Sequence, residues 1–317
     1  MSRRGGGCLT AAAVALSLVV LALAAGLVCL VLTNGAPTAE VGAPLEEELV
    51  PKAFDEYAWG ELSEVAAMIS SAPSDEEGRA IAEKYGVSVG SVRPLALDDG
   101  RTCSLTVVGI RADERADGSG VSGLTLMASP ISVRAMNEEE TNAGGWESSD
   151  LRSWLAAEGM GLLPGELAEA IVPVRKLTNN VGVTSDAASV TETDDSLWLF
   201  SASEVCGTVT WFTDEYGVEP NAHTGYVDFA PYDALLNLEG EQYEYFSAAG
   251  VSASSDPQGA LRLTYGGSET SWWYRTAYPF TYVGGDECYF YQVMASGYPS
   301  TTGLATSASG VTVGFCL

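Results

Sequence analysis

The feature that most constrains this sequence is a long uncharged stretch near its N-terminus. Arg3 and Arg4 are the only charged residues before Glu40, and the apolar centre of the stretch covers residues 8–33, mostly Ala, Val and Leu. As a helix this centre would reach ~39 Å, more than the ~30 Å hydrocarbon core of a bilayer requires. A cleaved secretory signal usually has an apolar centre of only ~7–15 residues. The stretch therefore predicts one transmembrane helix over residues 8–33, and the membrane is the first partner that we expect.

The flanking charges predict how this helix is oriented. Basic residues precede it and three glutamates, 46–48, follow it, which places the N-terminus inside the cell. We expect residues 1–7 in the cytoplasm and the C-terminal domain outside the cell, as in a single-pass protein of the cell membrane. Residues 34–50 are rich in Ala, Pro, Gly and Glu and predict an extended spacer. Cleavage near Ala36 stays open as an alternative, although Pro37 disfavours it.

The charge balance excludes one class of partner. The chain has 15 Lys and Arg against 42 Asp and Glu, a net charge of −27. Because nucleic acid is bound by cationic surfaces, we expect no nucleic-acid partner. With His223 as the only histidine and no motif for a prosthetic group, we also expect no cofactor and no metal site.

The rest of the chain reads as a short helical segment followed by strands and turns. Residues 51–90 have apolar residues at helical spacing, and Ser74 with Glu77 forms a capping box. Asp98-Asp99-Gly100 predicts a hairpin between strands at 92–97 and 102–110. Further strands are predicted at 124–128, 172–177, 197–200, 271–277, 288–295 and 311–317, with short helices near 151–155 and 164–171 and after Ser201. This order predicts an α+β domain over residues 91–317 with a mixed, mostly antiparallel sheet.

Several blocks in the second half of the chain carry a resemblance to a known family. They are NAGGWESSDLR at 142–152, Leu162-Leu163-Pro164, DSLWLFS at 195–201 with Glu204, EGEQY at 239–243, WWYR at 272–275 and Gly314-Phe315-Cys316. In their order and spacing, residues 90–317 resemble a bacterial domain of unknown function, family 6273. Tyr274-Arg275-Thr276 departs from the Leu-Arg-Ser that is more usual there.

The resemblance implies more than the residues alone do. Members of the family look like surface or secreted proteins of Gram-positive bacteria, with a C-type-lectin-like fold. Formylglycine-generating enzymes and hypervariable phage-receptor binders share that fold, so it implies a class of function and no single reaction.

Four cysteines follow the apolar stretch: Cys103, Cys206, Cys288 and Cys316. Outside the cell an even number permits two disulfides, in any of three pairings. Four buried free thiols are the alternative, and the spacing does not decide between them.

The aromatic residues around the double tryptophan are the first candidate binding surface. Trp272, Tyr274 and Tyr278 could stack on a sugar or hold a protein partner. The alternative is a structural role, in which large aromatics fill the core and Arg275 pairs with a buried carboxylate. Because neighbours on a strand point to opposite faces, we expect Trp273 to be buried and Trp272 to be open to a ligand.

Glu219-Pro220-Asn221 is the second candidate, since mannose-binding C-type lectins use Glu-Pro-Asn to hold calcium and sugar. Those lectins complete the site with Trp-Asn-Asp, which this chain lacks. We therefore include Glu219 and Asn221 as ligand-binding candidates without a metal, beside the simpler interpretation as a turn.

These observations favour a membrane-anchored extracellular protein whose domain binds a glycan or a protein without catalysis. One alternative is a cell-envelope enzyme related to the formylglycine-generating fold, although no pair of carboxylates or cysteines marks a catalytic centre. Another is a structural surface domain. An enzyme would show a pocket with several convergent carboxylates, whereas a binder would show a shallow aromatic surface.

Overall fold

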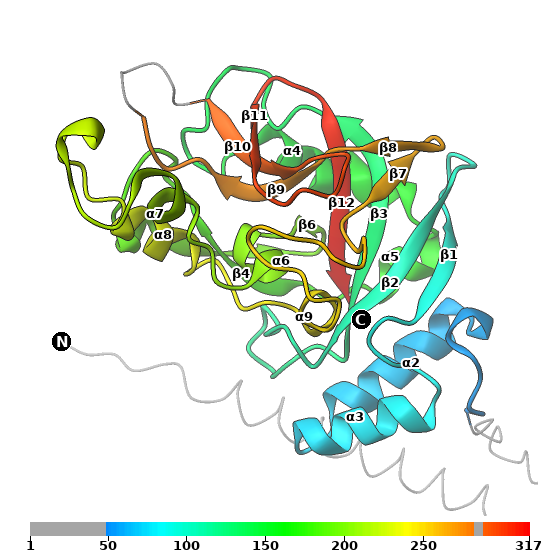
Figure 1. Ribbon diagram of the computed structural model, residues 1–317. Coiled ribbons are helices and arrows are strands. Elements are labelled where there is room, and N and C mark those ends of the chain that lie inside the picture. Colours follow the sequence, from blue (N-terminus) through cyan, green and yellow to red (C-terminus); the bar gives the residue numbers. More distant parts are fainter. Residues whose placement is uncertain (1–48, 282–287) are drawn as a thin grey trace, which may run out of the picture. The chain divides into compact units, whose positions relative to one another are not determined.

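The computed structural model describes residues 49–281 and 288–317 (Figure 1). Leu49–Leu317 forms one compact unit. It has helices on both faces of a central sheet, so the α+β class with a mixed sheet holds for these residues.

The predicted fold class also contained a transmembrane helix, and this part is corrected. Among residues 49–281 and 288–317, no helix combines the length and the apolar composition needed to cross a bilayer. The helices there are short, and the longest, α2 (Trp59–Ser70), packs one face on the domain. The segment predicted to span the membrane, 8–33, lies outside the described residues, as do residues 1–7 and most of the spacer.

The central sheet has eight strands, in the order β1-β2-β3-β12-β9-β10-β11, with β6 paired to β12. All its pairs are antiparallel except that of β9 with β12, which is parallel. The strands are β1 (Val92–Ala96), β2 (Thr102–Ile110), β3 (Leu124–Arg134), β6 (Trp198–Leu199), β9 (Trp272–Ala277), β10 (Tyr289–Val293), β11 (Thr301–Leu304) and β12 (Ser309–Cys316).

The hairpin predicted around Asp98-Asp99-Gly100 is confirmed. Ala96 pairs with Thr102, and Gly100 turns the chain with a φ of 87°, a conformation that favours glycine. Two smaller hairpins lie outside the main sheet: β4 (Val174–Asn179) with β5 (Val190–Asp195), and β7 (Leu263–Tyr265) with β8 (Ser268–Thr270).

The N-terminal helices dock directly on the sheet. α2 and α3 (Asp75–Lys84) lie together beside the β1–β2 hairpin (Figure 1). Ser74 caps α3 by accepting the amide of Glu77, as predicted. A methyl group at Gly123, just before β3, would overlap the carbonyl oxygen of Ala66, so the α2 backbone lies against the sheet with no side chain between them.

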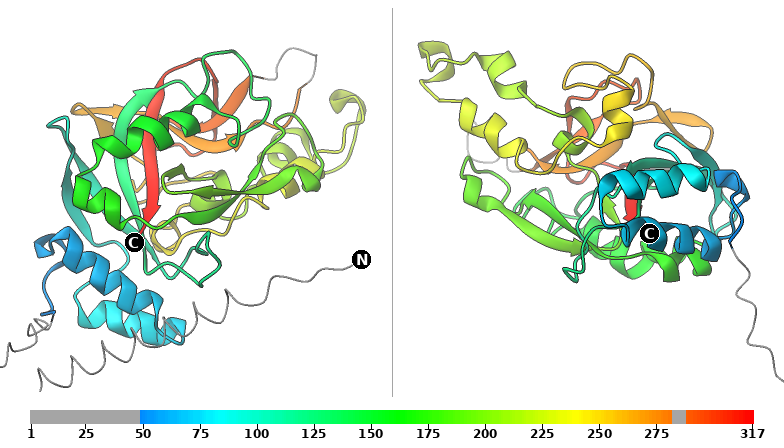
Figure 2. Two further views of the ribbon diagram at one scale, coloured as in Figure 1. Left: turned by 180° about the vertical axis from the view of Figure 1, so that it is seen from behind. Right: turned by 90° about the horizontal axis from the view of Figure 1, so that it is seen from below.

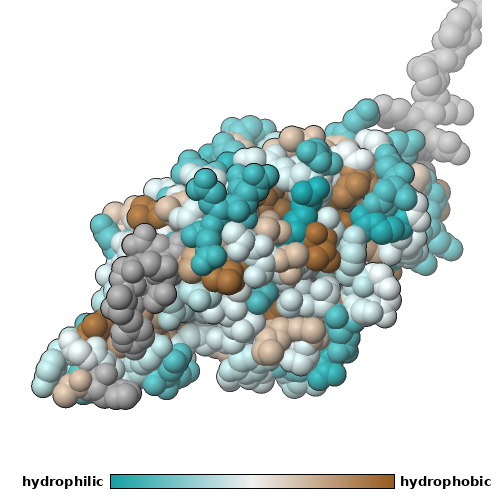
Figure 3. Space-filling model, turned by 90° about the horizontal axis from the view of Figure 1, so that it is seen from above, coloured by the Kyte–Doolittle hydropathy of each residue, from teal (hydrophilic) through white to brown (hydrophobic). Residues whose placement is uncertain are grey.

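Short helices cover both faces of the sheet. Seen from behind, the helical residues 150–170 cross one face (Figure 2), and helices from residues 202–248 contribute to the core on the other. They are α4 (Asp150–Trp154), the π-helical turn Leu155–Gly159, α5 (Gly165–Ala170), α6 (Ala202–Cys206), α7 (Trp211–Tyr216), α8 (Ala230–Leu236) and α9 (Glu244–Ala248), with 3-10 turns at Phe54–Glu56, Met160–Leu162, Ala187–Ser189 and Ala222–Thr224. On the face in Figure 3, apolar side chains form small separate spots among polar ones.

Two hydrophobic cores lie on the two faces of β9. Trp273 belongs to the core that includes α2, α4 and α5, and Trp272 belongs to the core beneath α6 to α9. Both tryptophans are fully buried, so the expectation that Trp272 is open to a ligand is wrong. The two side chains do point to opposite faces, but each face is covered by helices.

Candidate functional site

One cleft of the described structure has a volume of about 750 Å³ and is lined mostly by polar residues. Six segments that are distant in sequence form it: the N-terminal part of α3, the end of β2 with the following loop, β4, β5 through Glu192, α6 through Glu204, and residues 239–247 leading into α9. Its lining contains eight carboxylate side chains and four basic ones.

The loop after β2 brings Asp113 into the floor of this cleft. Arg111 has a φ of 56°, a left-handed conformation that is costly for a residue with a side chain. Its guanidinium holds this bend, because it donates to the carbonyl oxygens of Ile69 and Ser70 and pairs with Asp75. The chain then turns inward, and the Asp113 side chain is only 5% exposed.

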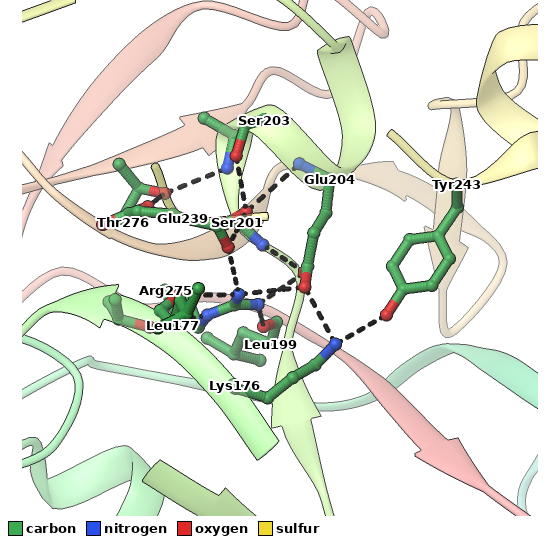
Figure 4. Close-up of polar contacts among 12 residues, drawn as sticks. Lys176, Leu177, Leu199, Ser201, Ser203, Glu204, Glu239, Tyr243, Arg275 and Thr276 are labelled. Atoms are coloured by element: carbon green, nitrogen blue, oxygen red, sulfur yellow. Dashed lines mark hydrogen bonds and ion pairs between the residues drawn. The ribbon is translucent and has the colours of Figure 1, made fainter. Parts of the chain in front are cut away.

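Lys176 lies at the centre of the floor and is 3% exposed. It comes from β4, where Val174, Lys176 and Thr178 share the buried face. Its Nζ donates to Glu204 Oε1 at 2.8 Å and to the Tyr243 hydroxyl at 2.6 Å (Figure 4). It also donates to Asp113 Oδ1 at 2.5 Å. The ammonium group also lies 4.5 Å from the centre of the Trp198 ring, close enough for a cation–π interaction.

Glu204 connects this lysine to a second buried cation. It is the third residue of helix α6 and completes its capping box, in which its Oε2 accepts the amide of Ser201 at 2.9 Å. Arg275 of β9 donates to both of its oxygens, at 2.5 and 3.0 Å (Figure 4). The same guanidinium donates to Thr178 Oγ1 and to the carbonyl oxygens of Leu177, Leu199 and Glu239.

The network keeps its four central charges ionised. Burial alone would raise the pKa of Asp113, but attraction to Lys176 and three hydrogen bonds outweigh it and lower that pKa. For Glu204 the effect of burial is likewise outweighed by Arg275 and Lys176, which lower the pKa of its carboxyl group. Burial would lower the pKa of Lys176 and of Arg275, yet the facing carboxylates raise both.

Glu239 is the exception among the buried carboxyl groups. Burial raises its pKa to about 7, against the attraction of Arg275. Its Oε1 accepts the amide of Asn179 at 3.0 Å, and its Oε2 accepts the hydroxyl of Thr276. Although Glu239 lines the cleft, both of its oxygens are therefore bonded within the protein.

The sequence suggested Trp272 and Tyr274 as ligand contacts, and the structure corrects this prediction. Both are fully buried, and the indole N–H of Trp272 donates to the carbonyl of Leu261 at 3.0 Å. Buried rings have no free face for a ligand to stack on. Tyr278 is half-buried and packs on Phe212 and Tyr291.

Glu219 and Asn221 lie elsewhere, on the exposed loop between α7 and α8. The Asn221 side chain donates to the carbonyl of Glu219 and accepts the amide of Thr224, which is the bonding of a turn. No group of three or more His, Cys, Asp or Glu side chains arranged to hold a metal occurs in residues 49–281 and 288–317.

The four cysteines are free thiols in this structure. Cys206, Cys288 and Cys316 are buried and Cys103 is half-buried. Burial raises the pKa of Cys206 to about 12 and that of Cys103 to about 11, so neither is a reactive thiolate near neutral pH.

The sequence interpretation missed Asp113 and Lys176 as site residues, although it anticipated a buried carboxylate partner for Arg275. A usable signal was present at Lys176, which stands in phase with Val174 on the buried face of its strand. No such signal was present at Asp113, because this residue follows a bend in a loop and contacts its partners only in the folded chain.

Blocks that carried the family resemblance meet in this structure. Glu204, Glu239, Tyr243 and Arg275 come from three of them and join in the network of Figure 4. In a second contact, Asp195 accepts the indole N–H of Trp146 at 3.1 Å and pairs with Arg152 at 2.7 Å. These sequence blocks therefore supply contacts that hold the domain together.

Comparison with known proteins gives one match. Residues 122–317, well over half of the chain, match the family described as "Domain of unknown function (DUF6273)". No curated protein and no solved structure matches the chain significantly. On this match the chain belongs to the DUF6273 family.

Proposed function

We propose that this protein is a non-catalytic binding protein and that the acidic cleft binds a cationic segment of a protein ligand. The charge of the cleft is the observation that carries the proposal. Its four basic side chains are all paired with carboxylates: Arg79 with Glu244, Arg111 with Asp75, Arg175 with Glu192, and Lys176 with Asp113 and Glu204. The eight carboxyl groups exceed them by four, or by three while Glu239 is protonated, so the field at the cleft favours a positively charged ligand.

The position of the carboxylates adds to this argument. Glu114 and Glu241 are exposed on the rim, where a lysine or arginine of a partner can reach them without desolvating the floor. The only aromatic side chain that lines the cleft is Tyr243, which is buried with its hydroxyl bonded to Asp113 and Lys176. Sugar-binding sites usually offer an exposed aromatic face, so we favour a basic peptide over a glycan.

We also propose the C-type-lectin-like fold for the matched region. In its support, β3 and β12, the first and last strands of that region, pair side by side from Thr125–Cys316 to Arg134–Ser309. Between β6 and β9 the chain leaves the sheet, forms helices α6 to α9 in a long segment, and then returns to the same sheet. A domain whose first and last strands pair, and whose long connecting segments lie outside the sheet, suits ligand binding.

An enzyme remains the second candidate, because several carboxylates converge in the cleft, as expected of an enzyme, and because the pKa of Glu239, about 7, suits a general acid or base. Its engaged oxygens argue against that role. The remaining carboxylates of the floor are held ionised by Lys176 and Arg275, so near neutral pH they can accept a proton but have none to donate.

Binding of fluorescent Lys/Arg-rich peptides, measured by anisotropy at low and physiological salt, tests the proposal. We expect saturable binding that weakens with salt, with acidic peptides and neutral oligosaccharides not competing. The double variant Glu114→Gln/Glu241→Gln should bind at least ~10-fold more weakly, corresponding to about 1.4 kcal/mol. Glu269→Gln, an exposed glutamate on β8 outside the cleft, is the matched control. Equal affinity in both variants, or equal binding of acidic peptides, would contradict the proposal.

A further inference from the structure

The side chains of Lys176 and Asp113 are placed for a reaction as well as for an ion pair. Nζ lies 2.5 Å from Oδ1, and both side chains are buried. Because a carbonyl C–O bond is about 1.23 Å long, Nζ lies at most about 3.7 Å from the carboxyl carbon. That separation is close to the ~3–3.5 Å of a reactive arrangement between a nucleophile and an acyl carbon.

The surrounding groups match those that acyl transfer requires. Asp113 Oδ2 accepts the hydroxyl of Thr125 at 2.5 Å, and Oδ1 accepts the hydroxyl of Tyr243 at 2.7 Å. Two such donors stabilise the negative charge that develops on the carboxyl oxygens during attack. Glu204 Oε1, 2.8 Å from Nζ, is placed to take a proton from the amine.

We propose that Lys176 and Asp113 condense to an intramolecular isopeptide bond, with Glu204 as the proton carrier. The Nζ–Cγ bond forms and one Cγ–Oδ bond breaks. Of the three protons on the ammonium group, one stays on the amide nitrogen and two leave with the oxygen as water. The ion pair already holds every atom of the products, so no oxidant, reductant or activating reagent is needed.

The site also favours the product over the ion pair. Condensation removes two buried charges, and such charges carry a large desolvation cost. Glu204 keeps its two-pronged pairing with Arg275 afterwards, so no uncompensated charge is left behind. The released water has an exit, because Asp113 lines the cleft.

Asp113 is the expected acyl partner even though Glu204 also contacts Nζ. Both Glu204 oxygens are committed to Arg275, which stabilises the unreactive carboxylate, whereas the oxygens of Asp113 accept the two hydroxyl donors. The bond would join the loop after β2 to β4, 63 residues away.

Tryptic mapping of the reduced full-length protein by mass spectrometry tests the proposal. Trypsin cannot cleave after an acylated lysine, so we expect one branched peptide of residues 112–115 and 176–262, lighter than the two parts by one water. Separate linear peptides 112–115 and 177–262 at full mass would overturn it. A dehydrated 176–262 peptide without 112–115 would place the bond at Glu204 and would also overturn it.

Three variants assign the roles of the groups. Asp113→Asn should give the same branched peptide, because loss of ammonia in place of water yields the identical amide. Lys176→Arg keeps a cation between the carboxylates but should give no branched peptide, while Lys84→Arg should leave it unchanged. Glu204→Gln should lower the cross-linked fraction measured at fixed times after synthesis. A branched peptide in Lys176→Arg would contradict the assignment of Nζ, and the result for the unmutated protein stands whether or not the variants fold.

Discussion

Arg275 donates to both carboxylate oxygens of Glu204, at 2.5 and 3.0 Å, and both side chains are buried. The pair joins β9 to α6, and the guanidinium also donates hydrogen bonds to three carbonyl oxygens of other segments. A buried pair of this kind is costly to form but far more costly to break on one side, since the remaining charge is then uncompensated.

This relationship gives the first prediction. Arg275→Met should lower the free energy of unfolding by about 3–5 kcal/mol, because the buried Glu204 loses the guanidinium that binds both of its oxygens. Arg275→Lys should recover part of the loss, since a lysine keeps the charge but not the planar two-pronged geometry. Urea unfolding followed by tryptophan fluorescence measures both. Arg262→Met, which removes an exposed arginine, is the control, and a loss below about 1 kcal/mol in Arg275→Met would show that the pair contributes little.

Glu239 should make the stability of the domain depend on pH. Its folded-state pKa of about 7 is raised from the 4.5 of an unperturbed glutamate, because the charged form is buried. A group with a raised folded pKa stabilises the protein fully below its unfolded pKa, and this contribution disappears as pH rises through 7. Between pH 4.5 and 8 the loss amounts to about 3 kcal/mol.

Comparison with Glu239→Gln isolates this effect. Asp113 and Glu204, whose lowered pKa values act in the opposite direction at acid pH, are common to both proteins and cancel in the difference. Relative to the unmutated protein, the glutamine variant should therefore gain stability from pH 5 to pH 8. Glu269→Gln, at an exposed site, should show a flat difference. A flat difference for Glu239→Gln as well would mean that its carboxyl group titrates normally.

The double tryptophan should be structural at both positions. Trp272→Ala and Trp273→Ala should each cost about 3–5 kcal/mol, because each leaves a cavity in its own core. Trp273 also donates its indole N–H to the carbonyl of Arg134 at 2.9 Å, and that acceptor would lose its partner. Thermal and urea unfolding measure the losses. Tyr226→Ala, at a tyrosine that is 72% exposed, should stay within about 0.5 kcal/mol. A mild Trp272→Ala would argue against the second core.

Gly123 should control the docking of the N-terminal helices. Gly123→Ala forces the backbone of α2 away from the sheet, because the added methyl group meets the carbonyl of Ala66. We expect a cost of about 1–3 kcal/mol and faster proteolysis within residues 59–84. Gly60→Ala, in α2 itself, has open space for its methyl group and should be neutral or slightly stabilising. Similar behaviour of the two variants would exclude close docking at Gly123.

Local features of the fold were determined by the sequence alone. The cap of α3 at Ser74, the turn at Gly100 and the start of a short helix after Ser201 were all predicted and are all present. Each depends on atoms within a few residues of each other, so the residue types and their spacing suffice.

Only the tertiary structure decided which faces are covered and which charges meet. The helices α7 to α9 have five to seven residues each, too few for a clear helical period, so nothing in the sequence showed that they pack into the same core as Trp272. Lys176 and Asp113 are 63 residues apart, and Arg275 and Glu204 are 71 apart. Long-range pairs like these form because the packed sheet excludes water, so that an unpaired charge would be costly there. No local sequence pattern shows which charges will be buried together.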